Sequence, residues 1–158
     1  MIFTDYYLSP VGLLEIKADE EAVIGIRLTE EEELYRPNGI TEEAIRQLEE
    51  YFNGERKAFD VPLKITGTDF QKRVYNALLK VPYGSTVSYK DLTIMAGNRR
   101  GYQATGQAMH VNKIMIMVPC HRVISNDGSI GGYGQHIEVK KYLLRMEGGW
   151  LMDYNSQV

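Results

Sequence analysis

The chain has 158 residues, 44% of them hydrophobic and 25% charged, which fits one or two small globular domains, and it has no apolar run near the roughly 20 residues of a membrane-spanning helix. Its net charge of −3 conceals two halves of opposite sign, because residues 1–60 carry 6 basic and 15 acidic side chains whereas residues 61–147 carry 12 and 5; this favours a second half that faces phosphates over an unevenly charged solvated surface. One cysteine excludes an intramolecular disulfide, no Cys/His spacing indicates zinc, and the N-terminus lacks the pattern of a signal peptide, so we expect a reduced cytoplasmic protein with no metal.

The first 60 residues predict a small sheet followed by a helix. Residues 1–28 contain three short apolar stretches separated by polar turns at 9–12 and 18–21, a pattern typical of three strands. An acidic connection follows, and then a helical pattern that Thr41 can cap and Gly54 can end. Residues 55–67 resemble a crossing segment between two domains, with the boundary near Pro62.

The second part is richer in helices. Thr68 and Gln71 form a capping-box pattern ahead of an apolar stripe, and Ser88 opens a second, shorter helix. A short turn separates this helix from a third, at about residues 102–111, and the spacing is that of a helix-turn-helix. A last helix ends at Gly148.

The third helix has unusually small side chains. Ala104, Gly106 and Ala108 leave parts of its surface nearly bare, which permits a close approach by another group. Two explanations remain open at this point: close packing on a neighbouring helix, or a surface that faces a ligand.

The single cysteine follows an apolar run, Ile114–Val118, which we predict to be a buried strand ended by Pro119. Cys120 and His121 then begin a turn, where two neighbouring side chains can converge. A thiolate is a strong nucleophile, and a nearby base or cation favours it. The alternative is a small buried cysteine beside a core histidine.

The stretch VPCHRVI resembles the active-site signature of the O6-alkylguanine-DNA alkyltransferases, and weaker similarity extends from about residue 7 to residue 148. The resemblance implies an α+β fold. Residues 1–62 would form a small N-terminal α/β, ribonuclease H-like domain. Residues 63–150 would form a mostly helical domain with a winged-helix-like helix-turn-helix, followed by a tail at 151–158.

The resemblance also implies the catalytic residues. Cys120 would take the alkyl group from O6 of guanine and keep it as a thioether, in a single turnover. His121 would accept the thiol proton through a water, and Glu147 would polarise His121. Asn112 would hold the reactive turn by hydrogen bonds, and the phenol of Tyr89 would assist the departing guanine.

The remaining expected site residues would bind the flipped base and the DNA. Met109 and Tyr133 would wall the base pocket, the amide of Gly134 would face O6, and carbonyls at Cys120 and Val123 would read the exocyclic amine. The third helix would enter the minor groove of duplex DNA that contains O6-alkylguanine. The residues expected at the DNA are Arg99, Arg100, Tyr102, Gln103, Ala104, Gly106 and Arg122.

The chain departs from the family pattern at several positions. Gln103 stands where an arginine usually fills the gap left by the flipped base, and Lys113 replaces a proline. Val111 replaces a small residue, and Tyr75 replaces a frequent tryptophan. We expect no cofactor, no membrane association and a monomer.

Three other functions would each account for part of the sequence. The first is a protein that binds alkylguanine without accepting the alkyl group. Such relatives replace the cysteine, so Cys120 argues against this function, whereas Gln103 is compatible with it. A Cys-His hydrolase would need an oxyanion hole and turnover. A plain helix-turn-helix regulator would make the PCHRV stretch a coincidence.

Overall fold

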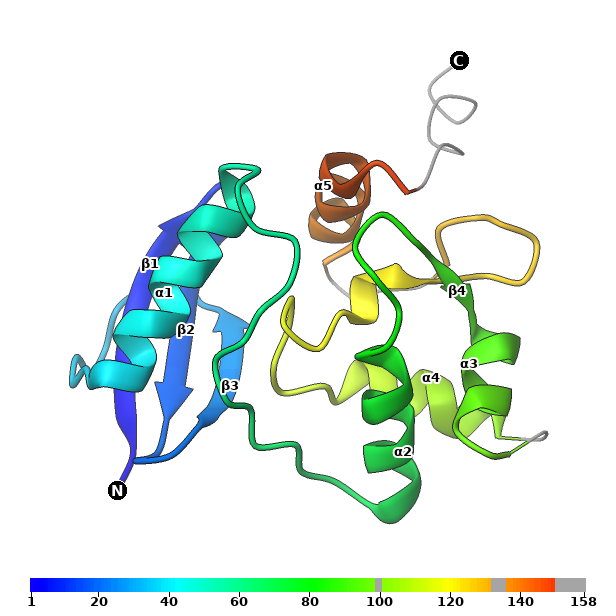
Figure 1. The fold of residues 1–158 in the computed structure, drawn as a ribbon, viewed down its shortest axis with the longest axis horizontal. Coiled ribbons are helices and arrows are strands. Elements are labelled where there is room, and N and C mark those ends of the chain that lie inside the picture. Colours follow the sequence, from blue (N-terminus) through cyan, green and yellow to red (C-terminus); the bar gives the residue numbers. More distant parts are fainter. Residues whose placement is uncertain (99–100, 132–135, 150–158) are drawn as a thin grey trace. The chain divides into compact units, whose positions relative to one another are not determined.

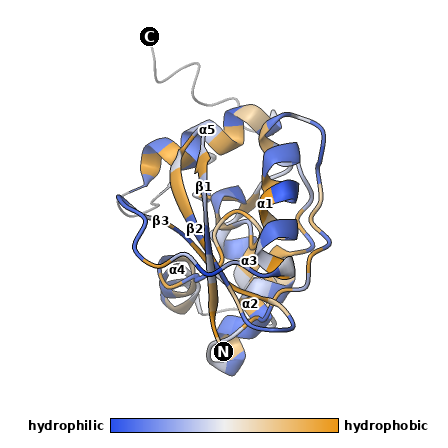
Figure 2. Cartoon of the chain, turned by 90° about the vertical axis from the view of Figure 1, so that its left-hand side faces the viewer, coloured by the Kyte–Doolittle hydropathy of each residue, from blue (hydrophilic) through white to orange (hydrophobic). Residues whose placement is uncertain are grey.

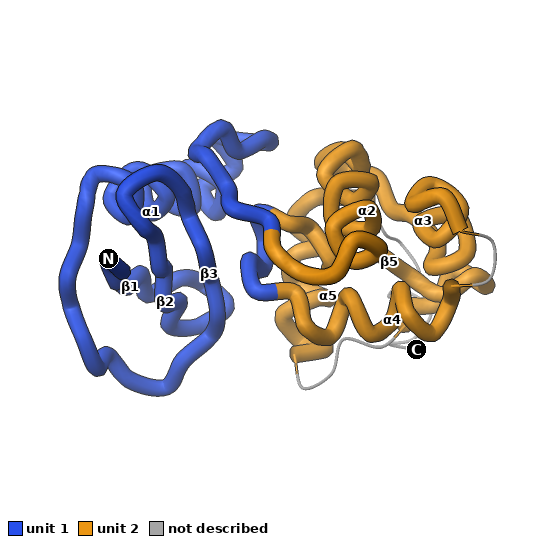
Figure 3. The backbone as a smooth tube through the Cα atoms, turned by 90° about the horizontal axis from the view of Figure 1, so that it is seen from below, with its two compact units in different colours: residues 1–65, 113–117 blue, residues 66–112, 118–158 orange. Residues whose placement is uncertain are grey.

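The computed structural model describes residues 1–98, 101–131 and 136–149 (Figure 1). The chain forms two compact units, one made of residues 1–65 and 113–117, the other of residues 66–112 and those from 118 onwards (Figure 3). A short segment late in the sequence therefore belongs to the first unit. The expected site residues Arg99, Arg100, Tyr133 and Gly134, and the predicted tail at 151–158, lie outside the described residues.

The sheet of the first unit is an antiparallel meander, as the sequence predicts. Strands β1 (Phe3–Ser9), β2 (Gly12–Ala18) and β3 (Val23–Leu28) pair in the order β1-β2-β3. The tight connection between the first two strands has Gly12 at φ 125°, a conformation that L side chains rarely adopt. The predicted three-stranded sheet is confirmed.

Helix α1 (Gly39–Phe52) packs on β1 and β2 through one apolar face that includes Ala44, Leu48 and Tyr51, and both hydrophilic and hydrophobic residues appear along it in Figure 2. The prediction that Thr41 is its N-cap is wrong. The cap is Asn38, whose side chain accepts the amide of Thr41, while the Thr41 hydroxyl accepts the amide of Asn38. This reciprocal pair starts the helix one turn earlier than the Thr-Glu-Glu pattern indicates.

The apolar run before the cysteine is buried, but the prediction that it forms a strand is wrong. It makes one parallel bridge, from Ile114 to Ile26, and then turns. The amide of Met117 donates to the carbonyl of Met115 at 2.8 Å across Ile116, whose φ is 72°. That geometry is a γ-turn, a strained arrangement for a β-branched residue. An apolar run without a period predicts burial but does not predict backbone geometry.

The second unit is mostly helical. Helix α2 (Asp69–Leu78) begins with the predicted Thr68–Gln71 capping box. Ser88 caps helix α3 (Tyr89–Met95) by accepting the amide of Asp91, and helix α4 (Tyr102–His110) follows. Helix α5 (Ile137–Glu147) ends at Gly148, which has a left-handed conformation. These predicted boundaries are confirmed to within a few residues.

One contact joins the helices of this unit to the cysteine segment, and another joins two of the helices to each other. The two-residue strands β4 (Val87–Ser88) and β5 (Val123–Ile124) pair in parallel. Since β4 leads directly into α3 and β5 directly follows the Cys-His-Arg segment, this pairing brings the start of α3 beside the cysteine. The hydroxyls of Thr93 on α3 and Thr105 on α4 lie 2.7 Å apart in the buried contact between those helices.

Candidate active site

The reactive turn is a local structure built around Pro119. The carbonyl of Val118 accepts the amide of Cys120 at 2.8 Å, and Pro119 has φ −82° and ψ 64°, the values of an inverse γ-turn. Proline suits this position because its φ is already fixed near this value and it has no amide to satisfy. Cys120 then begins a 3-10 turn, η1 (Cys120–Arg122), with only 5% of its surface exposed.

Asn112 ties this turn to the end of α4. Its side-chain amide donates to the carbonyl of Val118 at 3.0 Å, so that carbonyl accepts from both Asn112 and Cys120. A carbonyl oxygen has two lone pairs, and both are used here. The structure therefore brings together two of the expected site residues, with Asn112 eight positions before the cysteine.

His121, Arg122 and Glu147 form a buried charged cluster. The Oε2 atom of Glu147 lies 2.8 Å from Nε2 of His121, and the guanidinium of Arg122 donates to both carboxylate oxygens, at 2.8 and 3.1 Å. Arg122 also donates to the carbonyl of Val81 at 2.8 Å. The side chain of His121 is fully buried and that of Glu147 is 1% exposed, so these bonds form away from solvent.

The charges of this cluster determine the tautomer of His121. Burial disfavours a carboxylate, but the bonds from His121 and Arg122 outweigh burial and lower the pKa of Glu147 to about 2. Burial lowers the pKa of His121, so its neutral form is favoured. An ionised Glu147 can only accept, and Nε2 of His121 must therefore carry the proton. The basic nitrogen is then Nδ1, a buried atom with no hydrogen-bond partner in the described part of the chain.

Arg122 is not placed as expected. We predicted that it contacts DNA, but it is 7% exposed and its guanidinium is bound to Glu147 and Val81. A bidentate pair with a buried carboxylate leaves the guanidinium little freedom to reach a phosphate. Arg122 instead neutralises Glu147 and holds it against His121.

The phenols of Tyr75 and Tyr89 and the ammonium group of Lys140 interact electrostatically with Cys120. Burial raises the pKa of Tyr89 and of Tyr75, and a negative charge at Cys120 raises both further. Burial lowers the pKa of Lys140 to about 8, and Cys120 partly opposes that shift. A positive charge beside a thiol favours the thiolate.

Lys140 is a residue of this site that the sequence analysis missed. It is fully buried on α5, and its ammonium donates to the carbonyl of Val123 at 2.6 Å. A signal was present, because Lys140 shares the spacing i, i+3, i+4, i+7 with Leu143, Leu144 and Glu147 and so lies on the buried stripe of the helix. A lysine on an apolar stripe is rarely buried without a specific partner.

The expected DNA-facing residues of α4 differ in exposure. Tyr102, Gln103 and Ala104 are exposed, whereas Gly106 is half-buried and Ala108 is fully buried. Apart from the backbone of its own helix, a Cβ placed on Gly106 would meet no described atom within 4 Å, so packing among the described residues does not require a glycine there. Met109 is half-buried near the end of the helix.

The described residues include neither a metal-binding cluster nor a membrane-spanning helix. In the ranges 1–98, 101–131 and 136–149, no group of three His, Cys, Asp or Glu side chains could hold a metal ion. Within the same ranges, no helix combines the length and the apolar character that crossing a bilayer requires.

Comparison with known proteins covers nearly the whole chain. Residues 2–65 match the 6-O-methylguanine DNA methyltransferase ribonuclease-like domain, and residues 69–149 match the 6-O-methylguanine DNA methyltransferase DNA-binding domain. A methylated-DNA–protein-cysteine methyltransferase of Methanosarcina acetivorans is 40% identical over 153 residues, which cover 89% of this chain and 94% of the relative.

Two solved structures have the same fold. The Mycobacterium tuberculosis O6-methylguanine methyltransferase aligns with a TM-score of 0.85 at 38% identity, covering 96% of this chain and 95% of that chain. A crystal structure of Mycobacterium tuberculosis OGT in complex with DNA aligns with a TM-score of 0.83 at 39% identity, covering 93% and 92%.

Proposed function

The chain belongs to the O6-methylguanine DNA methyltransferase family, and we propose that Cys120 is the residue that accepts the alkyl group in its repair reaction. The chemistry is that of a methylated-DNA–protein-cysteine methyltransferase. The observation that carries the proposal is a buried cluster in which Glu147 binds His121 and Arg122, the two residues that follow the cysteine. This cluster leaves the basic Nδ1 of His121 without a protein partner in the described chain.

The proposed reaction is a direct displacement at the alkyl carbon. Nδ1 of His121 accepts the thiol proton of Cys120 through a water, and the ammonium of Lys140 favours the resulting thiolate. The sulfur forms a bond to the alkyl carbon as the bond from that carbon to O6 breaks. The electron pair passes to the guanine, which takes a proton from Tyr89; the raised pKa of Tyr89 keeps its phenol protonated until that step.

Glu147, Arg122 and Asn112 act by positioning. Glu147 holds the proton of His121 on Nε2, and Arg122 keeps Glu147 ionised. Asn112 holds the carbonyl of Val118 and thereby the turn that presents the sulfur. The carbonyl of Val123 accepts Lys140 and retains a second lone pair for the amine of the base. We propose, from the resemblance, that Tyr133 walls the base pocket and that the amide of Gly134 faces O6.

The proposed substrate is duplex DNA that contains O6-alkylguanine, bound by α4 in the minor groove with the damaged nucleotide turned out of the stack. An enzyme cannot reach the alkyl carbon inside a duplex, and a poorly paired base costs least to extrude. The open space at Gly106 supports a close approach by an outside group rather than helix packing. A related protein crystallised with DNA also supports this proposal.

We further propose that Arg99 and Arg100 contact phosphates and that the chain acts as a monomer in the cytoplasm. One thiol per chain suffices for one transfer, and a reactive thiol persists best in a reducing compartment. The two-unit organisation proposed from the sequence assigns this chemistry to the part that begins near residue 63.

The test is a single incubation with an oligonucleotide duplex carrying O6-methylguanine, followed by intact mass and peptide mapping. We expect one methyl group on Cys120, no turnover beyond one equivalent, and none on a Cys120→Ser variant that still binds the duplex. Binding without any mass change would support the lesion-binding alternative. Loss of the methyl group from DNA with repeated turnover would support a hydrolase.

A further inference from the structure

The start of α4 lacks the side-chain cap that usually fixes the first turn of a helix. Its N-cap is Gly101, which supplies no capping hydrogen bond, although its carbonyl accepts the amide of Thr105 at 2.8 Å. By contrast, α2 and α3 both begin with a side-chain cap. Among the described residues, the first turn of α4 therefore depends on contacts with neighbouring side chains, which at Gly101 are Asn98 and Phe70.

Helix α2 supplies such contacts at both ends of the turn between α3 and α4. The Nε atom of Arg73 donates at 3.0 Å to the carbonyl of Ala96, the C-cap residue of α3. The ring of Phe70 lies at the other end, where its Cζ atom would be 3.1 Å from a Cβ placed on Gly101. The guanidinium of Arg73 lies over the ring of Phe70, 5.6 Å from the centroid, and links the two contacts.

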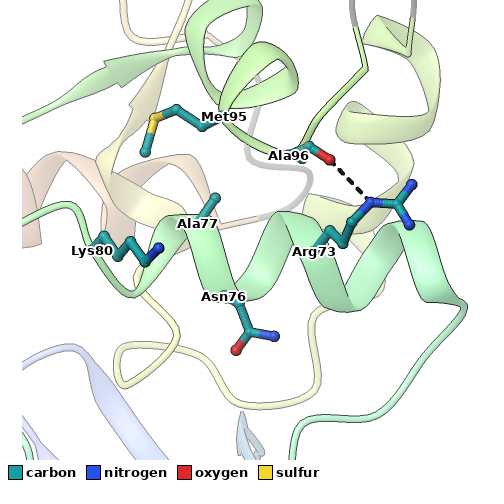
Figure 4. A pocket seen from close by; sticks show the side chains of 6 residues that line it. All are labelled: Arg73, Asn76, Ala77, Lys80, Met95 and Ala96. Carbon is teal, nitrogen blue, oxygen red and sulfur yellow. Dashed lines mark hydrogen bonds between the residues drawn. The ribbon is translucent and has the colours of Figure 1, made fainter.

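The bond between Arg73 and Ala96 lies beside an open pocket between α2 and α3. The pocket has a volume of about 360 Å³ and is lined by Arg73, Asn76 and Ala77 of α2, by Lys80 in the turn that follows α2, and by Met95 and Ala96 (Figure 4). The bond from Arg73 to Ala96, dashed in Figure 4, crosses at one end of this pocket. Lys80 lines the same pocket from the turn that follows α2.

We propose that Arg73 is a positioning residue for DNA recognition, which fixes the end of α3 and, through Phe70, the start of α4. This rests on the proposed role of α4 in the minor groove. Arg73 acts mainly through its Nε donor and to a smaller extent through its stacking on Phe70, and its charge does not serve as a phosphate contact. Gln103 lies at the second residue of α4, so a change in the direction of the helix start moves that side chain first.

The experiment compares variants that separate the donor from the charge. In Arg73→Gln the amide nitrogen occupies the same position along the side chain as Nε of arginine, so the donor stays and the charge is lost. The methionine of Arg73→Met is as long as glutamine but has no hydrogen-bond donor. Lys80→Gln is the matched control, since it removes a cation that lines the same pocket as Arg73. For binding, each protein also carries Cys120→Ser, so that the duplex is bound without reacting, and is titrated with a duplex carrying O6-methylguanine over a series of salt concentrations. Reaction with free O6-benzylguanine is measured on the same proteins with Cys120 intact.

We expect Arg73→Met to bind about tenfold more weakly, as the loss of one hydrogen bond implies. Arg73→Gln and Lys80→Gln should bind within about twofold of the unchanged protein. The slope of log affinity against log salt should be the same for all four proteins. Reaction with free O6-benzylguanine, which needs no recognition helix, should be unchanged in all of them.

Two results would overturn the proposal. If Arg73→Gln loses as much affinity as Arg73→Met and the salt slope falls by about 0.9, Arg73 is a phosphate contact instead. If Arg73→Met binds normally, the link is not needed. Should Arg73→Met fail to fold, the affinity and slope of Arg73→Gln still decide between the two roles. Failure of the proposed function would instead appear in the unchanged protein, as an absence of methyl transfer to Cys120.

Discussion

Replacing Glu147 by glutamine tests the charged cluster directly. The pKa of Glu147 is lowered from 4.5 to about 2, and each pKa unit is worth about 1.4 kcal/mol, so its ionisation adds about 3 kcal/mol to folding at neutral pH. Breaking a buried ion pair by removing one partner costs about 3–5 kcal/mol, which agrees. We expect Glu147→Gln to lower the free energy of unfolding by about 3 kcal/mol, measured by denaturant titration at pH 7.

The same substitution should slow alkyl transfer by about 100-fold or more, since general-base catalysis typically supplies that much. Glutamine has one acceptor oxygen, and Arg122 and His121 compete for it. If Arg122 takes the oxygen, the amide donates to Nε2 of His121 and moves the imidazole proton to Nδ1, which then cannot accept the thiol proton. The assay is single-turnover transfer of a radiolabelled methyl group from duplex DNA, sampled over time.

The pH dependence gives a second check with a defined sign. A carboxylate with a lowered folded pKa stabilises the protein above its unfolded pKa of about 4.5 and loses this contribution as pH falls towards 2. The stability difference between the unchanged protein and Glu147→Gln should therefore shrink between pH 5 and pH 3. Glu138→Gln is the matched control, because Glu138 is an exposed acid at the first turn of the same helix. A stability loss under 1 kcal/mol at pH 7, or a normal transfer rate, would refute the reasoning.

Four further substitutions test other parts of the second unit. Tyr75→Phe removes a buried hydroxyl that donates to the carbonyl of Ala108 at 2.7 Å, so thermal unfolding should reveal a loss of about 1–3 kcal/mol, and an unchanged midpoint would mean that the bond contributes nothing. Thr93→Val and Thr105→Val should each destabilise the α3–α4 contact by about 1 kcal/mol or more, and the double variant should cost less than the sum in a double-mutant cycle; simple additivity would exclude a coupled hydroxyl pair. Gln103→Arg should speed repair of duplex DNA more than reaction with free O6-benzylguanine, because arginine adds a charge and a plane that can stack, and equal effects on the two substrates would contradict this.

Local hydrogen bonds explain which elements were predictable. The capping box at Thr68 and the cap at Ser88 join groups three residues apart, so the sequence around them contains the whole interaction. The N-terminus of α1 was not predicted correctly because a distant contact takes part in it. Asn38 and Thr41 are both good caps, and which one starts the helix depends in part on a contact of Thr41 with Asp5, 36 residues away.

The candidate site shows the same division. The sequence by itself determined that Cys120 stands in a turn beside a base, because Pro119 fixes φ and ends the preceding segment. It did not determine the partner of Arg122, since a phosphate and a buried carboxylate are equally suited to a guanidinium. Only the packing of α5 places Glu147 at the guanidinium of Arg122, 25 residues away in sequence, and Lys140 at the carbonyl of Val123, 17 residues away. Short-range geometry is encoded by neighbouring residues, whereas the choice among distant partners of equal chemistry is made when the helices pack.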